Sequence, residues 1–388
     1  MQAMVPSDVD LVVRRHPLQV QLTQQAGTSA SASATNIAPD HPDQPANVPL
    51  EALLASYSTP YPFQSYVKRE RRGDVEQVLQ SKQLQEGIDF AFLNDEKLEK
   101  VFLVQVREAS MLDGCALATI CHPSEAYDDC VTKLKMDAAS HCAKPPPFAD
   151  RTIPELADNA TPETVLETLL AHTSKGIVIG EVHHHINSKR LLIDNMERMA
   201  RLGVETLFLE HLFFDVDKKD LDSYMQSPPG SAMPDALKSR LAGLDRQQLW
   251  ATVADEALKA RYCLSRVVEA AKLAGLQIVP IDCAASYNVY RSGLVASPRD
   301  EKIRYQVMNY LADKCITGRD LPGKWLAFVG SAHVNTCLEV PGLAELTGAI
   351  SLIVSDAREA SGHPPVRTRV KGYAGAIDPD VVLSIPLD

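Results

Sequence analysis

Several features are scarce in this sequence of 388 residues, and each scarcity argues against a class of protein. No apolar run approaches the roughly 20 residues that a membrane-spanning helix needs. The first residues, 1–18, hold acidic side chains and prolines where a secretory signal would have an apolar core, so we expect no such signal. The net charge is −11 and no long basic block occurs, so we expect no nucleic-acid partner, because phosphate binding requires clustered lysine and arginine.

Closely spaced cysteine pairs are also missing. The eight cysteines include no Cys-x-x-Cys pair, which argues against a structural zinc site. The earlier four, together with two histidines, are the residues that such a site would have used: Cys115, Cys121, Cys130, Cys142, His122 and His141. The later four lie in apolar surroundings: Cys263, Cys283, Cys315 and Cys337. A chain of this length has little need of disulfides, so we predict buried thiols in a reducing compartment.

The composition that is present is typical of a soluble globular protein, with 45% hydrophobic and 23% charged residues. One short basic run, Lys68 to Arg72, interrupts the acidic trend. Its ordinary interpretation is a solvated helix face. The alternative is a weak contact with an anionic membrane surface.

The chain divides into three parts by composition. Residues 1–48 are rich in Ser, Ala, Gln, Thr and Pro, which predicts a disordered tail; it is either a plain tail or a secretion segment. Residues 49–149 show mainly helical periodicity, with one predicted strand at 100–108. The proline-rich run 143–154 marks a boundary, and residues 150–388 form the third part, the predicted catalytic domain.

Strands alternate with helices in the third part, which predicts an α/β fold with a largely parallel sheet flanked by helices. The segment 227–248 carries proline and glycine and is interpreted as a lid with short helices. The predicted strands are 176–180, 204–210, 276–282, 324–333, 348–356 and 380–387, the last as a candidate edge strand. The predicted helices are 188–203, 252–275 and 297–315.

Three of these strands run out into glutamate or histidine. The stretches are "IGEVHHH", "FLEHL" and "FVGSAHV", which supply Glu181, His183, Glu210, His211 and His333. Ligands of open α/β sheets bind beyond the carboxyl ends of the strands. A single histidine there is usually structural, but three strand ends of the same kind predict a shared functional site.

Spacing assigns directions to these side chains. Glu181 and His183 are two residues apart, so an extended backbone points both the same way, whereas His184 points away. Glu210 and His211 are adjacent, so we expect both to reach one site only if the strand ends at Leu209.

At this point a family resemblance becomes specific. The ordered set of Glu-x-His, Glu-His and a distant His resembles the erythromycin esterase/ChaN-like/TIKI-TraB superfamily, and within it the Ras/Rap-specific endopeptidase domains of MARTX bacterial toxins. The segment 297–311 also resembles the helix before the last motif, with Asp300, Arg304 and Asn309 in place. The resemblance covers residues 160–360. It implies a hydrolase with Glu181, His183, Glu210, His211 and His333 as catalytic residues.

The chemistry of these residues favours water as the nucleophile, because no serine elbow and no adjacent cysteine is present. Glu181 or His183 would take the proton of the water. We favour Glu181 as the base, with a pKa raised by its pocket, and His183 and His333 as polarising donors. Glu210 would orient an imidazole. Substrate contacts are expected from Gly180, Arg304 and Ser331.

A metal-dependent site is the alternative within the enzyme class. The imidazoles and a carboxylate could hold zinc or manganese with an open position for water. The HExxH signature is absent, and we expect no metal or other cofactor.

The favoured function is an endopeptidase-type bacterial effector that acts on a host protein, with a Ras-family small GTPase as one candidate. It would be secreted and act in the host cytoplasm; otherwise it would remain in the bacterial cytoplasm. Two alternatives stay open. One is a ChaN-like haem- or iron-binding protein that uses Tyr287, Tyr290 or an exposed histidine as a ligand. The other is a small-molecule esterase.

Overall fold

The structure is a computed structural model that describes residues 48–57, 125–183, 185–247, 255–283, 286, 298–357, 363–374 and 377–387. Most of the predicted tail, the basic run Lys68 to Arg72 and the predicted strand 100–108 lie outside these residues. Among the described helices, none has the length and apolar character required to cross a membrane.

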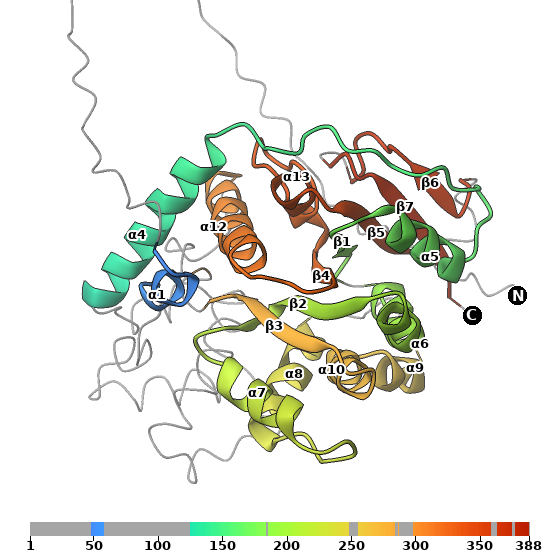
Figure 1. Cartoon of the computed structure of the whole chain (residues 1–388), viewed down its shortest axis with the longest axis horizontal. Helices are drawn as coiled ribbons and strands as arrows, with labels where there is room; N and C mark the ends of the chain where they lie inside the picture. The colour runs from blue at the N-terminus through green and yellow to red at the C-terminus, as the bar shows by residue number, and fades with distance from the viewer. Residues whose placement is uncertain are drawn as a thin grey trace, which may run out of the picture. The chain divides into compact units, whose positions relative to one another are not determined.

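Within the described residues, seven strands form one sheet in the order β3-β2-β4-β1-β5-β7-β6, with β6 alone antiparallel to its neighbour (Figure 1). The predicted α/β class with a largely parallel sheet is confirmed. The strands are β1 Gly176–Glu181, β2 Val204–Phe213, β3 Gln277–Asp282, β4 Lys324–Gly330, β5 Ile350–Ala357, β6 Val366–Thr368 and β7 Val381–Pro386.

Helices cover both faces of this sheet. They are α1 Leu50–Ala55, α4 Glu125–Cys142, α5 Pro162–His172, α6 Asn187–Arg201, α7 Lys218–Gln226, α8 Asp235–Gln247, α9 Glu256–Arg261, α10 Leu264–Leu273, α12 Pro298–Thr317 and α13 Leu343–Thr347. In Figure 1, α12 and α13 lie above the sheet, whereas α6 and α10 lie below it.

Alternation along the strands builds a separate hydrophobic core on each face. Ile177 and Ile179 of β1 pack into the core on the α6 side, and Val178 packs into the core on the α12 side. All three side chains are fully buried, as expected for a parallel sheet covered on both faces. The sheet is therefore a rigid base with its strand ends fixed from two sides.

Two sequence predictions about elements are wrong. The strand predicted for 380–387 is not at the edge, because the short β6 pairs with its outer side. The long helix predicted for 252–275 is divided into α9 and α10. Cys263 is extended there, and the buried carboxylate of Asp245 accepts from the backbone N–H of Leu264 at 3.0 Å, so a side chain caps the new helix.

The described part of segment 49–149 packs onto α12. Tyr57 follows α1, and its hydroxyl donates to Asp137 Oδ2 of α4 at 2.6 Å. It also lies 2.8 Å from the hydroxyl of Tyr310 in α12. Helix α4 forms as predicted, and its Val131, like Tyr57, belongs to the α12-side core. The predicted domain boundary near residue 149 stays a prediction.

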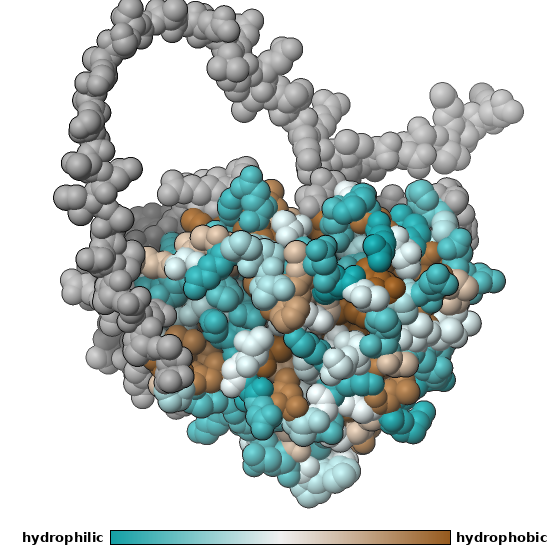
Figure 2. Space-filling view, turned by 45° about the horizontal axis from the view of Figure 1, so that its top comes forward, coloured by the Kyte–Doolittle hydropathy of each residue, from teal (hydrophilic) through white to brown (hydrophobic). Residues whose placement is uncertain are grey.

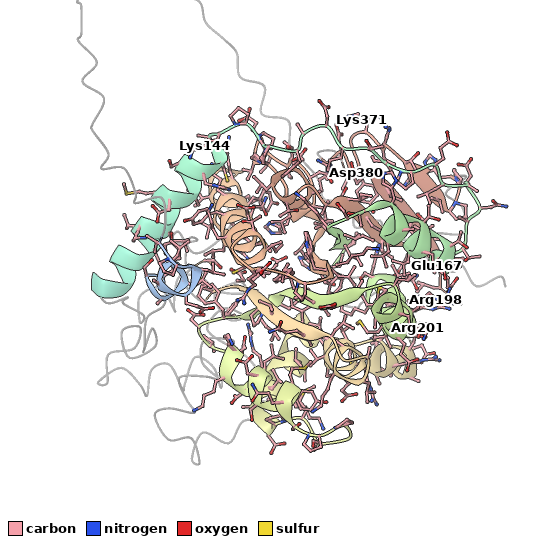
Figure 3. The ribbon with its side chains drawn as sticks, in the orientation of Figure 1. Lys144, Glu167, Arg198, Arg201, Lys371 and Asp380 are labelled. Carbon is pink, nitrogen blue, oxygen red and sulfur yellow. The ribbon has the colours of Figure 1, made fainter. Side chains whose placement is uncertain are left out.

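Ion pairs also form on the surface of the protein. Arg198 of α6 lies 2.5 Å from Glu167 of α5, measured from Nη1 to Oε1 (Figure 3). Such a partly exposed pair contributes little to stability, on the order of 1 kcal/mol or less. Figure 2 shows hydrophilic residues mixed with small hydrophobic areas over one face. Burial in the two cores, rather than surface pairing, therefore dominates the stability of the fold.

Candidate functional site

The strand ends bring together the five residues that the sequence singled out. Strand β4 lies between β1 and β2, so the ends that carry Glu181, Glu210 and His333 are neighbours. Residues Glu181 and Gly330 are paired in the sheet, and the chain after Gly330 turns into the 3-10 helix η3, Ser331–His333. The site therefore lies at the carboxyl edge of the sheet, as predicted.

Glu181 is the centre of the half of the site on the α6 side. Its side chain is fully buried, and its Oε1 accepts hydrogen bonds from His183 Nδ1 and His211 Nε2, both at 2.8 Å. Its Oε2 accepts from the ammonium of Lys189 in α6, also at 2.8 Å. The ring of His211 stacks on Phe328 with a centroid distance of 5.1 Å. The carboxylate is thus held by three donors.

This environment contradicts the expected role of Glu181. Burial alone would raise its pKa, but the Lys189 ammonium and the two imidazoles outweigh burial and hold the pKa of Glu181 well below its usual range. A carboxylate that is ionised and already hydrogen-bonded on both oxygens is a weak proton acceptor. Glu181 is therefore suited to orient and stabilise imidazoles, and the predicted raised pKa is wrong.

His183 is the solvent-facing member of the cluster. Its side chain is 63% exposed, although Nδ1 is bound to the buried Glu181. The hydrogen bond to Glu181 raises the pKa of His183, against the opposing effect of burial. Because Nδ1 donates to the carboxylate, the neutral ring carries a lone pair on Nε2. His183 can therefore accept a proton from a bound molecule.

The second half of the site lies on the α12 side. Oε2 of Glu210 accepts from the backbone N–H of Gly330 at 2.7 Å, and its Oε1 lies 3.3 Å from Arg304 Nη2 and 3.5 Å from His333 Nε2. Burial acts to raise the pKa of Glu210, but the electrostatic effects of His333, which is charged only in the acid range where Glu210 titrates, and of Arg304 lower it to about 2. Glu210 is therefore ionised at neutral pH.

Arg304 is held inside the protein rather than displayed to a ligand. It is 5% exposed, and its Nη2 lies 2.6 Å from Asp282 at the end of β3. Its Nη1 donates to Ser286 at 3.3 Å. Burial raises the pKa of Asp282, although Arg304 opposes this. The predicted substrate contact is therefore not what the structure shows, and Arg304 instead fixes the position of Glu210.

His333 has a defined tautomer. Asn309 donates through Nδ2 to the carbonyl of Pro341 at 2.8 Å, which turns its Oδ1 towards His333 Nδ1 at 2.7 Å. Burial lowers the pKa of His333 to about 4, so the ring is neutral at pH 7 with its proton on Nδ1. The lone pair of Nε2 makes this nitrogen an acceptor in the resting protein, rather than the donor that the sequence led us to expect.

The two halves lie on opposite faces of the sheet, and this corrects a further expectation. Strand β2 does not end at Leu209 but continues to Phe213, with a register shift between these residues. Alternation sends Glu210 to the α12 side, with Arg304, and His211 to the α6 side, with Glu181. Both contribute because the site straddles the edge of the sheet.

His183 links these halves across the end of β4. A Cβ atom added to Gly330 would lie 3.2 Å from His183 Cε1 and 3.6 Å from Glu210 Oε2. The imidazole and the Glu210 carboxylate therefore both lie against Gly330, while Nδ1 of the same ring binds Glu181. Absence of a side chain at Gly330 is what leaves room for it.

The other predicted site residues have structural surroundings. A Cβ on Gly180 would lie 2.7 Å from Val334, so this glycine permits close packing of β1 against η3. Ser331 starts η3 and is partly buried. His185 accepts from the backbone N–H of Asp356 at the end of β5, at 3.0 Å. Substrate binding by Gly180 and Ser331 stays a prediction.

The segment predicted to be a lid supports the site from the α6 side of the sheet. Its second part is α8, whose Leu237 and Leu241 are buried in the α6-side core. Asp245 of α8 is 8% exposed. Burial raises its pKa to about 6, against the lowering effects of the Leu264 hydrogen bond and of the charges of Lys189 and His211. The segment is therefore partly a structural support of the Glu181 cluster.

Sequence reasoning missed three residues of this network. Asp282 ends β3, and the rule applied to the other strand ends would have found it. Lys189 lies in the first turn of the helix after β1, where a lysine usually points to solvent. Asp245 lies within a segment that was interpreted as a lid. No local pattern indicated that the last two are buried.

Metal and haem ligation stay untested. Among the described residues, no group of three or more His, Cys, Asp or Glu side chains has an arrangement that would hold a metal ion. Tyr287 and Tyr290 lie outside the described residues. The side chains of Cys283, Cys315 and Cys337 are buried as predicted, whereas Cys263 is partly exposed, and all four are free thiols.

Comparison with known proteins gives a consistent picture. No protein-family model matches the chain. The sequence is 24% identical over 196 residues to a multifunctional-autoprocessing repeats-in-toxin protein of Vibrio vulnificus. The matched region covers 49% of this chain and 3% of that protein. The chain thus corresponds to a small part of this relative.

Solved structures show the same relationship at the level of fold. RRSP, a MARTX toxin effector domain from Vibrio vulnificus, has a TM-score of 0.50 and 20% identity, over 74% of this chain and 62% of that chain. A structure of bacterial protein toxins has a TM-score of 0.50 and 17% identity, over 79% of this chain and 72% of that chain. The predicted resemblance to MARTX effector domains is confirmed, and the wider superfamily stays a prediction. The chain is therefore similar in sequence and fold to bacterial toxin effector domains.

Proposed function

We propose that the chain is a hydrolytic bacterial toxin effector that cleaves a peptide bond in a host protein. The main support for this proposal is the environment of His183. Its Nδ1 is bound to the buried carboxylate of Glu181, and its ring is exposed to solvent. A histidine oriented by a carboxylate is a common general base. The similarity to MARTX effector domains supports the assignment to toxins.

In the proposed reaction His183 Nε2 takes a proton from water as the water oxygen bonds to the substrate carbonyl carbon. The carbon–nitrogen bond then breaks, and the leaving amine receives the proton from Nε2. Glu181 stabilises the imidazolium that exists between these steps. Glu210 also lies beside Gly330, and its charge favours the same charged ring.

The partner would be a host protein, and the chain would act in the host cytoplasm after secretion. A Ras-family small GTPase is the first protein to test, because the Glu-x-His, Glu-His and distant His motifs resemble those of the Ras/Rap-specific endopeptidases. Metal independence and the absence of a cofactor are part of the proposal.

The test is to incubate the purified protein with a eukaryotic cell lysate, and separately with a purified small GTPase, and to identify new protein termini by mass spectrometry. His183→Ala should abolish every cut, while His172→Ala, at an exposed histidine on α5, should retain them. If no protein is cut while a small chromogenic ester is hydrolysed, the esterase alternative replaces the proposal. A Soret absorbance with added haem and no hydrolysis would favour the haem-binding alternative.

A further inference from the structure

Each carboxylate of the site has its own buried cation on the helix that covers its face of the sheet. Arg304 of α12 lies 3.3 Å from Glu210, and Lys189 of α6 lies 2.8 Å from Glu181. Lys189 is fully buried, which is rare for a lysine unless it is paired. Burial of an ammonium is costly, so its presence beside Glu181 calls for a functional reason.

The position of Lys189 keeps it away from any substrate. Its Nζ binds Oε2 of Glu181, whereas both imidazoles use Oε1. Nζ also lies 6.0 Å from the centre of the Phe328 ring, which stacks on His211. With no exposed surface, Lys189 cannot take part in the reaction directly, and any effect must pass through Glu181 and the histidines.

The effect of Lys189 on the histidines is electrostatic. Glu181 is a buried anion, and a buried anion needs one positive charge nearby. If Lys189 were neutral or absent, a protonated His183 or His211 would be the nearest remaining source of that charge. His183 would then hold its proton at neutral pH and could not accept another from water. With Lys189 present, the charge of Glu181 is balanced without a proton on His183 Nε2.

We propose that Lys189 is a positioning residue that balances the charge of Glu181 and so makes the proton of His183 easier to lose, which favours the ring's action as a base. The consequence for catalysis rests on the proposed function, but the effect on His183 does not. The electrostatic effects have the required signs. Glu181 raises the pKa of His183, chiefly through the hydrogen bond, and Lys189 lowers it.

Several other charged groups lie near His183 and Glu181 and affect their charge states. Glu210 of β2 also raises the pKa of His183, and the charges of His333 and His183 disfavour each other. On the other side of Glu181, His211 stabilises the carboxylate and Asp245 of α8 lies within its electrostatic reach. Among these groups, Lys189 is the buried cation that binds Glu181 directly.

The experiment is an NMR titration of the His183 ring, assigned with His183→Asn, in the wild type, Lys189→Gln and Lys189→Arg. The glutamine keeps a hydrogen-bond donor but removes the charge, and we expect the titration midpoint of His183 to rise by about one pH unit. The arginine keeps the charge and should leave the midpoint within a few tenths of a unit of wild type. A midpoint that is unchanged in Lys189→Gln overturns the proposal.

A second variant guards against misfolding of Lys189→Gln. Glu181→Gln removes the anion and leaves Lys189, so the midpoint of His183 should fall below the ordinary value of about 6.5. A midpoint that stays at the wild-type value would also refute the charge balance. These titrations need no substrate.

The matching kinetic experiment is the pH dependence of kcat/KM for Lys189→Gln with a cleaved protein. Its acid limb should move upwards by the same amount as the titration. A shifted titration without any hydrolysis by the wild type would refute the proposed function but leave the role of Lys189 intact.

Discussion

Gly330 is the position at which a single methyl group tests the geometry of the site. In Gly330→Ala the new Cβ would lie 3.2 Å from Cε1 and 3.3 Å from Nε2 of His183, and 3.6 Å from Oε2 of Glu210. Carbon contacts are optimal at about 3.5–4.0 Å, so the imidazole must move by a few tenths of an ångström. The backbone at Gly330 has φ −60° and ψ 144°, which alanine adopts without strain.

The structure predicts which property of the protein this movement affects. His183 is largely exposed, so its ring can swing outwards at a small cost in stability, within about 1 kcal/mol. The displacement loosens the hydrogen bond between Nδ1 and Glu181 and moves Nε2 away from Glu210. Misplacement of a catalytic group by up to 1 Å costs up to about 100-fold in rate, so we expect kcat/KM to fall by about 10- to 100-fold.

The assay is cleavage of the protein substrate at several substrate concentrations, with thermal unfolding measured on the same samples. His172→Ala, at an exposed histidine of α5, is the control, because it changes a residue outside the site. Wild-type activity of Gly330→Ala, or a loss of activity that follows a large fall in Tm, would refute the argument that His183 crosses the end of β4.

Other consequences follow from the same network. His183→Ala and His333→Ala should each reduce hydrolysis by at least about 10³-fold with the far-UV circular dichroism unchanged, and near-normal rates in both would remove the site assignment. Prolonged chelation should leave activity intact, and recovery with zinc or manganese alone, with a stoichiometric metal content, would instead establish a metallohydrolase. The pKa of Asp245 is raised to about 6 from an ordinary 3.8, so between these pH values the folded protein binds more protons than the unfolded chain and stability falls as pH rises, by about 3 kcal/mol from this residue. Because the lowered pKa of His333 acts in the opposite direction in both proteins, the test is the difference between them: in urea unfolding between pH 4 and 7, the stability of the wild type should fall relative to that of Asp245→Asn as pH rises. A difference that stays constant with pH would contradict the burial of an ionisable Asp245.

Much of the fold was readable from local patterns. The apolar run before Glu181 and the periodic segment that became α6 are strong signals for a strand and a helix. The helix ends where Gly203 adopts φ +91°, a conformation that glycine adopts readily. Elements whose ends depend on tertiary contacts were not readable. The break between α9 and α10 depends on Asp245, which is distant in sequence, and the covering of β7 depends on three residues of β6.

The residues of the site could be predicted from the sequence, but the role of each residue could not. Residues at strand ends could be found because parallel strands end at one edge. The state of Glu181 depends on Lys189, whose burial follows from helix packing and not from any motif. The direction of His333 depends on Asn309, twenty-four positions earlier in the chain. Protonation states arise from such distant pairs, so a sequence pattern names the titratable groups without fixing their roles.

Because the site lies across the edge of the sheet, the proposed activity depends on the packing of the helices on both faces. Glu181 and His211 are held by the layer that contains α6, whereas Glu210 and His333 are held by the layer that contains α12. A substitution deep in either layer can slide one half relative to the other by a fraction of an ångström without touching a polar residue. Loosening of either layer should therefore reduce the proposed activity before it unfolds the protein.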